Sequence, residues 1–349
     1  MEEDLQAQAV SLQLPSIPYS YGFTNNGGFD VFTGVDDNIA TLGRVLFYDQ
    51  NLSLNNSISC GTCHKQAIAF SDNVAFSKGF QNHQTLRNTL AIQNISNTIN
   101  NSFFAIEPKL FWDGRANFLN TMVLMPIVNH VEMGMGQADD IVARVNQQAY
   151  YPELFNKAFG SPEADIDKIA SALSSFVSSI TSGSTKFDLA NNSIVALNGL
   201  EEEGRLLFFN KYNCNSCHQT GQLNGYEMGG GLVNIGLETN YSDKGLEGVT
   251  NDPADNGKFK IPNLRNIALT APYMHDGRFR SLDEVLDHYS RGIKDHPSLD
   301  ARLRNGVTGQ PMILNISDHE KSAIIAFLNA LTDYSMITDV RFSNPFKVR

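Results

Sequence analysis

The sequence lacks any apolar run near the roughly 18 residues that a membrane-spanning helix needs. It also opens without a charged stretch followed by an apolar one, so MEEDLQAQAV is not a secretory signal peptide. Either a native leader has been trimmed or the protein stays in the cytoplasm. Basic residues are the minority, 26 against 37 acidic ones, which gives a net charge of −11. This balance argues against nucleic-acid binding, although an acidic surface could steer a basic partner.

Length and composition set the next limits. At 349 residues the chain exceeds one typical domain of about 150 residues, so two domains are expected. Hydrophobic residues make up 42% and charged residues 18%, which is ordinary for a globular protein. Tryptophan occurs once and cysteine only four times, and all five residues lie within short words that the chain repeats.

All four cysteines lie in two copies of one pattern, C-x-x-C-H. Residues three apart share a face of a helical turn, so two thiols can bond the two vinyl groups of one haem. The histidine that follows can then reach the iron as its proximal ligand. A redox C-x-x-C, a zinc half-site and a disulfide framework are the alternatives, but a disulfide leaves both histidines unexplained. The predicted haem-binding residues are Cys60, Cys63, His64, Cys214, Cys217 and His218.

Further short words surround the two haem patterns in the same order. One shared word could arise by chance, but four in one order make chance a poor explanation. We therefore predict a mainly α-helical fold with two cytochrome c-like haem domains related by internal duplication, long loops and few short strands. Residues 1–190 would form the first domain and 191–349 the second, with the final residues able to pack back on the first. The paired words are LGRVLFYDQ (42–50) with EGRLLFFNK (203–211), LRNTL (86–90) with LRNIAL (264–269), and FWDGR (111–115) with MHDGR (274–278).

Apolar periodicity predicts the main helices. Apolar residues between 39 and 46 share one helical face, and so do those between 166 and 180. Ser317 and Glu320 form a capping-box pattern, which predicts the start of a helix before AIIAFLNAL. Segments rich in Gly, Asn and Pro are predicted as loops: 1–35, the domain junction at 182–199, and 221–260.

Taken together, these words resemble the bacterial di-haem cytochrome c peroxidases, a superfamily that includes MauG, the enzyme that matures tryptophan tryptophylquinone in methylamine dehydrogenase. The resemblance extends from about Ile39 to Leu331 and implies two c-type haems with different tasks. Its motifs are the two C-x-x-C-H words, FWDGRA (111–116), a P-x5-E-M run (Pro126–Met133) and LRNIALTAPYMHDG (264–277).

The resemblance makes the haem at Cys60–His64, here called haem one, the site of peroxide reduction. Glu132 of the P-x5-E-M run would lie over its open iron position. A carboxylate there can take a proton from one peroxide oxygen and return it to the other, which is worth ~10²–10⁴-fold in rate. A surface glutamate without a role is the alternative. Many family members carry glutamine where this chain has Met122, which cannot donate a hydrogen bond; Met122 could equally be core filling.

The single tryptophan, Trp112, has a counterpart at His275 in the second DGR word. The resemblance places Trp112 between the two haems as a relay for electrons. Core packing is the alternative for a lone tryptophan.

The haem at Cys214–His218, haem two, would transfer electrons, and its sixth ligand sets its potential. The resemblance puts Tyr289 there, as in the MauG branch, whereas other family members use methionine. In SLDEVLDHY (281–289), Tyr289 falls on the apolar face, and His288 points about 100° away. A capping box of Ser281 and Glu284 would start this helix. Alternative ligands are Met274, Met228, Met312 and His288, or an open site.

Two further sites follow from the resemblance. A calcium ion between the domains would use Asn88 and the carbonyls of Thr270 and Pro272, and oxygen ligands suit Ca²⁺. His83 could block haem one until reduction, as a loop histidine does in some relatives, although its spacing favours an exposed loop histidine.

We therefore predict a periplasmic di-haem peroxidase, because covalent haem attachment is normally extracytoplasmic. It would reduce hydrogen peroxide with electrons from a small cytochrome c or cupredoxin. A MauG-like enzyme that oxidises a protein substrate at long range is one alternative, and a di-haem electron carrier without catalysis is another. Family members are often homodimers, but no self-complementary patch stands out in the sequence.

Overall fold

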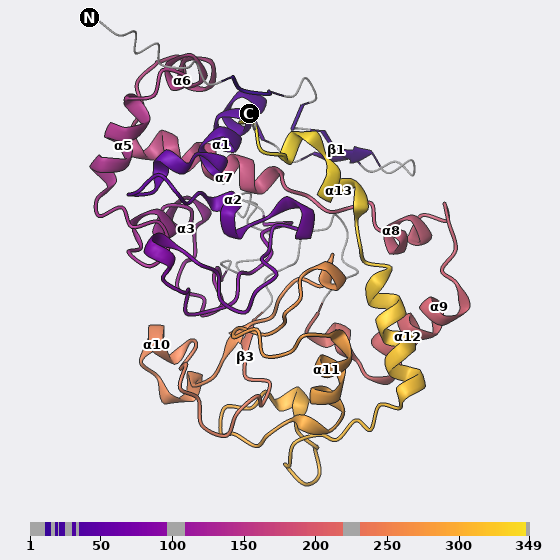
Figure 1. The fold of residues 1–349 in the computed structure, drawn as a ribbon. Coiled ribbons are helices and arrows are strands. Elements are labelled where there is room, and N and C mark those ends of the chain that lie inside the picture. Colours follow the sequence, from indigo (N-terminus) through magenta and orange to yellow (C-terminus); the bar gives the residue numbers. More distant parts are fainter. Residues whose placement is uncertain are drawn as a thin grey trace, which may run out of the picture.

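The computed structural model describes residues 11–14, 18–19, 21–24, 30–32, 35–95, 109–218 and 231–346. These residues are mainly helical, as predicted, with two pairs of short antiparallel strands. Figure 1 shows two lobes, one holding α1 to α7 and the other α9 to α12. None of the described helices is long and apolar enough to cross a membrane.

The helices have the following bounds: α1 Asp37–Tyr48, α2 Cys60–Cys63, α3 Leu119–Met122, α4 Met125–Val128, α5 Ala138–Asn146, α6 Tyr151–Phe159, α7 Ile166–Ser179, α8 Lys186–Asn191, α9 Gly199–Leu206, α10 Glu247–Thr250, α11 Leu282–Asp287, α12 Asp318–Asn329 and α13 Tyr334–Thr338. The strands are β1 Tyr21–Thr24, β2 Asp30–Phe32, β3 Leu232–Val233 and β4 Phe259–Lys260. Short 3₁₀ turns join them, and single π-turns continue α9 (Leu207–Lys211) and α11 (His288–Gly292).

Helix α1 packs on α7 in the centre of the first lobe, which confirms both predicted apolar faces. Asp36 caps α1 by accepting hydrogen bonds from the backbone N–H groups of the first turn. The two helices touch at their backbones, because a Cβ built on Gly43 would lie 1.8 Å from the Ala172 carbonyl oxygen. The rings of Phe47 and Phe176 meet beside this contact, with their centroids 5.2 Å apart.

Helix α9 packs on α12 in the second lobe, and this pair also meets at a glycine. A Cβ on Gly204 would lie 1.9 Å from the carbonyl oxygen of Ala323. The predicted capping box of Ser317 and Glu320 is present and begins α12. Each lobe is thus built around one close helix pair.

The two DGR words form the same turn. The residue two positions before each aspartate has a positive φ, +63° at Phe111 and +75° at Met274. Such angles are costly for side chains with a Cβ, so the surrounding structure must impose them. In both turns the aspartate accepts a 3.2 Å hydrogen bond from the arginine backbone two residues later. Isolated bridges close the turns, Leu110 with Ala116 and Tyr273 with Phe279.

The two LRN words make different contacts. Asn266 of the second word shares a positive φ angle and a partner with Asn94 rather than with Asn88 of the first. Asn94 and Asn266 both have positive φ angles, +56° and +60°. Both side chains also bond Ser182, at its backbone and its hydroxyl respectively. The identical residues 86–88 have other partners: the Asn88 side chain bonds the Val74 carbonyl, and Arg87 bonds Asp243.

The last described residues return to the first lobe, as the sequence prediction allowed. Met336 and Phe342 are buried in the core around α1 and α7. Gln66 donates to the Met336 carbonyl at 3.1 Å, and Tyr48 donates to the Phe342 carbonyl at 2.7 Å. The predicted loops are partly structured: α8 lies within 182–199, β1 and β2 within 1–35, and β3, α10 and β4 within 221–260.

Candidate active site

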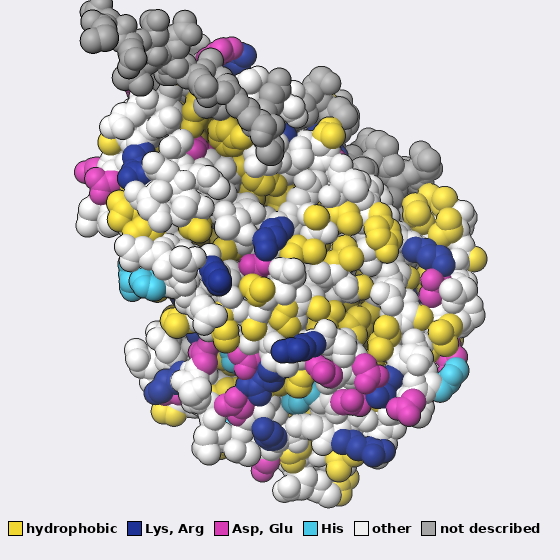
Figure 2. Space-filling view, viewed as in Figure 1, with side chains coloured by type: hydrophobic (Ala, Val, Ile, Leu, Met, Phe, Trp, Pro, Cys, Tyr) yellow, Lys and Arg dark blue, Asp and Glu magenta, His cyan; other side chains and the backbone are white. Residues whose placement is uncertain are grey.

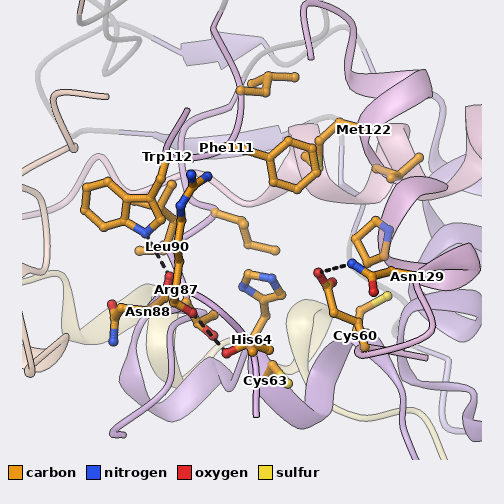
Figure 3. A pocket seen from close by; sticks show the side chains of 18 of the residues that line it. Cys60, Cys63, His64, Arg87, Asn88, Leu90, Phe111, Trp112, Met122 and Asn129 are labelled. Atoms are coloured by element: carbon orange, nitrogen blue, oxygen red, sulfur yellow. Dashed lines mark hydrogen bonds between the residues drawn. The ribbon is translucent and has the colours of Figure 1, made fainter. Parts of the chain in front are cut away.

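A cavity of about 1030 Å³ lies in the first lobe and opens towards the second, large enough to hold a porphyrin. Its wall includes Cys60, Cys63 and His64. Figure 3 shows His64 between Trp112 on one side and Asn129 on the other. Segments from both lobes line it, including residues 260 and 262–263 of the second.

The two cysteines of the first C-x-x-C-H word lie in helix α2, and a capping box of Ser59 and Thr62 begins this helix. The Nδ1 atom of His64 lies 2.9 Å from the Phe70 carbonyl oxygen. A proton on Nδ1 would leave Nε2 free to bind iron, which is the usual arrangement for a ligating histidine. Burial lowers the pKa of His64, which favours the neutral imidazole that binds metals. Burial also raises the pKa of Cys60 to about 12, so the thiol is protonated.

Glu132 lines the same cavity from the loop after α4. Three backbone N–H groups, those of Glu132, Met133 and Gly134, bond the carbonyl of Asn129 and fold this loop tightly. The Asn129 side chain donates to Glu132 Oε1 at 3.0 Å, as the dashed line in Figure 3 marks. Burial raises the pKa of Glu132, while the charge of Arg115 lowers it. The carboxyl is therefore oriented and partly shielded from water.

Sequence reasoning missed three residues around Glu132. Arg115 lies over the Phe111 ring, 3.7 Å from its centroid, and bonds Asp113 at 3.0 Å. Asn129 orients the carboxyl, and His130, an exposed residue, lines the cavity beside it. Arg115 was visible as the arginine of the repeated DGR word, but nothing in the sequence tied it to Glu132. Met122 also lines the cavity, as expected of a residue near haem one.

Trp112 is held between the lobes by hydrogen bonds at both ends. Its Nε1–H donates to the Asn88 carbonyl at 2.8 Å, and its own carbonyl accepts from Lys260 N–H at 2.8 Å. Asn88 N–H in turn donates to the His275 carbonyl at 2.7 Å. The two DGR turns therefore meet through one asparagine backbone, and the indole lies in the cavity wall.

An ion-pair network fixes the same junction. Arg87 binds Asp243 of the second lobe through two nitrogens, at 2.7 and 2.8 Å, and Asp113 at 2.5 Å. Its guanidinium also lies 5.7 Å from the ring centroid of Phe259. That ring stacks on His275 with centroids 3.7 Å apart and planes 11° apart. The counterpart of Trp112 is thus a buried, stacked histidine at the lobe boundary.

The second C-x-x-C-H word has a related arrangement. His218 Nδ1 lies 3.2 Å from the Pro262 carbonyl, and burial lowers the pKa of His218 to about 4. Burial raises the pKa of Tyr289, and the thiols of Cys217 and Cys214 raise it further. His288 instead directs Nε2 to the Ile235 carbonyl at 2.9 Å. His288 is therefore engaged by the backbone of residue 235, whereas Tyr289 as a haem ligand stays a prediction.

The helix with Tyr289 begins as predicted in part. Ser281 caps α11 by accepting from Glu284 N–H at 3.2 Å. Glu284 does not complete a capping box, because its carboxylate accepts from the Arg280 N–H instead. Of the alternative ligands, Met274 and Met312 are partly buried, whereas Met228 lies outside the described residues.

The predicted calcium residues lie around Gly277. The Asn88 side chain donates to the Val74 carbonyl at 3.0 Å, next to Ala75. A Cβ on Gly277 would lie 2.6 Å from Ala75 Cα and 3.2 Å from Pro272 Cγ. Asn88 therefore lies beside Val74, Pro272 lies beside Gly277, and Thr270 is buried two residues before Pro272. His83, in contrast, is exposed and does not line the cavity.

Cysteine and histidine chemistry at these sites fits haem better than the alternatives. The four cysteines form no disulfide with one another. Among the described residues, no cluster of three or more His, Cys, Asp or Glu side chains could hold a metal ion. Two thiols and one oriented imidazole beside a porphyrin-sized cavity are the groups that a c-type haem requires.

Comparison with known proteins agrees with this chemistry. A family model described as di-haem cytochrome c peroxidase matches residues 37–193. The methylamine utilization protein MauG of Methylorubrum extorquens is 32% identical over 295 residues, which cover 83% of this chain and 77% of MauG. The chain belongs to the di-haem cytochrome c peroxidase family. Cytochrome c551 peroxidase of Nitrosomonas europaea is 35% identical, over 72% of this chain and 73% of that protein.

Solved structures extend the family likeness to the fold. A MauG-like protein associated with microbial copper homeostasis superposes with a TM-score of 0.75 at 32% identity, over 97% of this chain and 99% of that chain. The di-haem peroxidase BthA of Burkholderia thailandensis gives 0.70 at 20% identity, over 94% and 92%. The protein is thus a di-haem oxidoreductase of the peroxidase type.

Proposed function

We propose that the protein is a periplasmic di-haem c-type peroxidase that reduces hydrogen peroxide to water at haem one. One observation carries the proposal: a partly buried, oriented carboxyl, Glu132, lines the same cavity as Cys60–His64. An electron carrier does not require a carboxyl at this place. Removing a carboxyl from water costs free energy, and such groups are typical of catalytic sites. Bound at these residues, the haem supplies the redox chemistry of peroxide cleavage.

Glu132 is the proton carrier in this proposal. Asn129 occupies Oε1, which leaves Oε2 to take a proton from the nearer peroxide oxygen and return it to the departing one. The raised pKa of Glu132 suits a group that must hold a proton briefly near neutral pH. Met122 cannot donate a hydrogen bond to peroxide, so Glu132 orients it without that help.

Trp112 would carry electrons between the two haems. Its indole lines the cavity of haem one, and Lys260, bonded to its carbonyl, lies two residues before Pro262. The Pro262 carbonyl is the partner of His218, the proximal ligand of haem two. A short route of two hydrogen bonds and the intervening backbone therefore joins Trp112 to that ligand.

Covalent attachment of both haems, with His64 and His218 as proximal ligands, is part of the proposal. So is Tyr289 as the second ligand of haem two, which the effect of Cys214 and Cys217 on its pKa supports. An anionic phenolate would lower the potential of haem two. The calcium ion is proposed at Asn88, Thr270 and Pro272, where it would join the two lobes.

We further propose that the lobes arose by duplication, with domains at 1–190 and 191–349. The glycine contacts at Gly43 and Gly204, and the matching DGR turns, support this origin. The electron donor would be a small cytochrome c or cupredoxin. Figure 2 shows acidic and basic side chains interspersed over the second lobe, so the face in view has no single-sign patch to steer it. A homodimer remains part of the proposal by family likeness alone.

A second function is a MauG-like one, because the family resemblance gives tyrosine, as at Tyr289, as the second ligand of haem two in the MauG branch. In that function the enzyme would use peroxide to oxidise a protein substrate at long range. Relatives named MauG and a MauG-like structure support this alternative.

The experiment is EPR and optical spectroscopy of the ferric di-haem protein before and after one equivalent of hydrogen peroxide. Peroxidase chemistry predicts a spectral change at haem one that the Glu132→Gln variant slows by ~10²–10⁴-fold. A long-lived oxidised state and a low-spin haem two without a methionine–sulfur band would favour the MauG-like function. A wild-type protein that ignores peroxide in both redox states would leave an electron carrier.

A further inference from the structure

Outside the cavity, the first lobe contains a buried carboxylate bonded to two adjacent tyrosines. Asp49, only 2% exposed, ends helix α1. Its Oδ2 accepts from the Tyr151 hydroxyl at 2.7 Å and from the Tyr150 hydroxyl at 2.8 Å. Its Oδ1 accepts twice from Asn51, at 2.8 and 2.9 Å. The carboxylate is thus held in place with both phenols aimed at one oxygen.

This triad lies next to the haem-attachment turn. The Tyr48 ring packs on Gly61, between the two cysteines of haem one, because a Cβ on Gly61 would lie 2.5 Å from it. Tyr48 is joined to Asp49 by one peptide bond, and Phe47 lines the haem-one cavity. One ring contact, one peptide and one hydrogen bond therefore separate Gly61 from Tyr151. Figure 1 shows α1, α2 and α6 together in the same lobe.

The hydrogen-bond partners decide which tyrosine can be oxidised. A phenol that loses an electron becomes a strong acid and must pass its proton to a base. Tyr48 donates to the Phe342 carbonyl, which cannot take a proton at neutral pH. Tyr151 and Tyr150 donate to a carboxylate, which can. Burial raises the pKa of both phenols, so neither ionises without such a partner.

We propose that Asp49, Tyr150 and Tyr151 form a proton-coupled redox site that draws oxidising equivalents from haem one to the protein surface. The proposal rests on the proposed function, because peroxide reduction at haem one supplies the oxidant. In each step Tyr151 gives one electron to the oxidised haem and its proton to Asp49 Oδ2. The product is a neutral tyrosyl radical beside a protonated Asp49.

The second tyrosine provides the outlet. The rings of Tyr150 and Tyr151 lie 4.7 Å apart, and Tyr151 is fully buried whereas Tyr150 is partly exposed. Tyr150 can give an electron to the Tyr151 radical, and Asp49 then returns the proton to Tyr151. Tyr150 passes its own proton to the same Asp49 oxygen and becomes the radical. A small one-electron reductant, such as a phenol or an enediol, then reduces Tyr150, and Asp49 returns the proton. Two such cycles account for the two electrons of one peroxide.

The test uses the ferric di-haem protein, freeze-quenched after one equivalent of hydrogen peroxide without added reductant. We expect an EPR signal from an organic radical, which narrows when the protein carries ring-deuterated tyrosine. The double variant Tyr150→Phe/Tyr151→Phe should lose this signal. Tyr48→Phe, which removes a nearer phenol bonded only to a carbonyl, should keep it. Asp49→Asn should also lose it, because an amide cannot accept the proton.

Optical spectra of the same samples distinguish the two proposals. If haem one ignores peroxide in the wild type, the proposed function fails. If haem one responds but no tyrosyl signal forms, or the signal survives in the double variant, the redox site is refuted. Loss of the signal in Tyr212→Phe alone would also overturn it, because Tyr212 donates to a different carboxylate, Glu320, in the second lobe.

Discussion

Replacing Gly43 by alanine tests the packing on which haem one depends. Alanine favours a helix over glycine by about 1 kcal/mol, so propensity alone predicts a more stable protein. At Gly43, however, the new Cβ would lie 1.8 Å from the Ala172 carbonyl oxygen, about 1.6 Å short of the 3.4 Å at which ordinary contact begins. The obstacle is backbone, which cannot rotate away, so α1 and α7 must move apart.

The clash should outweigh the propensity gain. Overpacked cores typically lose about 1–3 kcal/mol, and a backbone obstacle belongs at the upper end of that range. After the propensity gain is subtracted, we expect Gly43→Ala to lower the free energy of unfolding by about 2 kcal/mol. Haem one should change as well, because Phe47 of α1 and both Leu173 and Val177 of α7 line its cavity.

Denaturant unfolding of the di-haem protein, followed by far-UV circular dichroism and by the EPR signals of each haem, measures both effects. Gly204→Ala provides the matched test in the second lobe, where the Cβ would lie 1.9 Å from the Ala323 carbonyl oxygen. It should perturb haem two and leave the haem-one signal alone. Gly199→Ala is the control, because no heavy atom outside its own helix lies within 4 Å of that Cβ and we expect no loss of stability.

Wild-type stability in Gly43→Ala would refute the backbone contact between α1 and α7. Equal disturbance of both haems by either variant would refute the assignment of one helix pair to each haem. It would also remove the main support for domains at 1–190 and 191–349.

Three further predictions address the site. Tyr289→Phe should remove the low-spin EPR signature of haem two and leave haem one unchanged; an unaltered spectrum would exclude Tyr289 as the ligand. Because burial raises the pKa of Glu132, the rate of reaction with peroxide should fall on acidification at a higher pH than for an exposed glutamate, since protonation removes the base. Stopped-flow rates across pH measure this fall, which should vanish in Glu132→Gln. Arg87→Lys keeps the charge but loses the two-nitrogen contact with Asp243, so the free energy of unfolding should fall by about 1–3 kcal/mol. Denaturant unfolding at low and high salt measures this fall. An unchanged free energy of unfolding would mean that the ion pair contributes nothing.

Local patterns in the sequence were enough to predict the local structure. The apolar faces of α1 and α7 and the capping box at Ser317 depend on residues three and four apart, and the structure confirms them. The same reasoning separated Tyr289 from His288, because a difference of one residue turns a side chain by about 100° on a helix. The His288 ring bonds the Ile235 carbonyl, and ligation by Tyr289 stays a prediction.

Contacts between distant segments could not be predicted from the same patterns. The words at 86–88 and 264–266 share three letters, yet Asn266 bonds Ser182, as Asn94 does, whereas the Asn88 side chain bonds the Val74 carbonyl. No local rule distinguishes an asparagine that bonds a residue 88 positions away from one that bonds its neighbours. The buried site at Asp49 could not be predicted for the same reason, since its two tyrosine partners lie about one hundred residues further along the chain.

Contacts between distant segments also explain how the two DGR turns are positioned. Trp112 and His275 occupy the same position in two identical turns, and Asn88 bonds the indole of one and the backbone of the other. The turns are therefore fixed against each other where the lobes meet. Only the first copy faces the cavity of haem one, and there an indole offers both a large aromatic ring and an N–H that needs one partner. The His275 ring instead stacks on Phe259, and its carbonyl rather than its ring makes the contact with Asn88. Two similar turns thus place different side chains at one boundary, and the relay role proposed for Trp112 applies to the first copy alone.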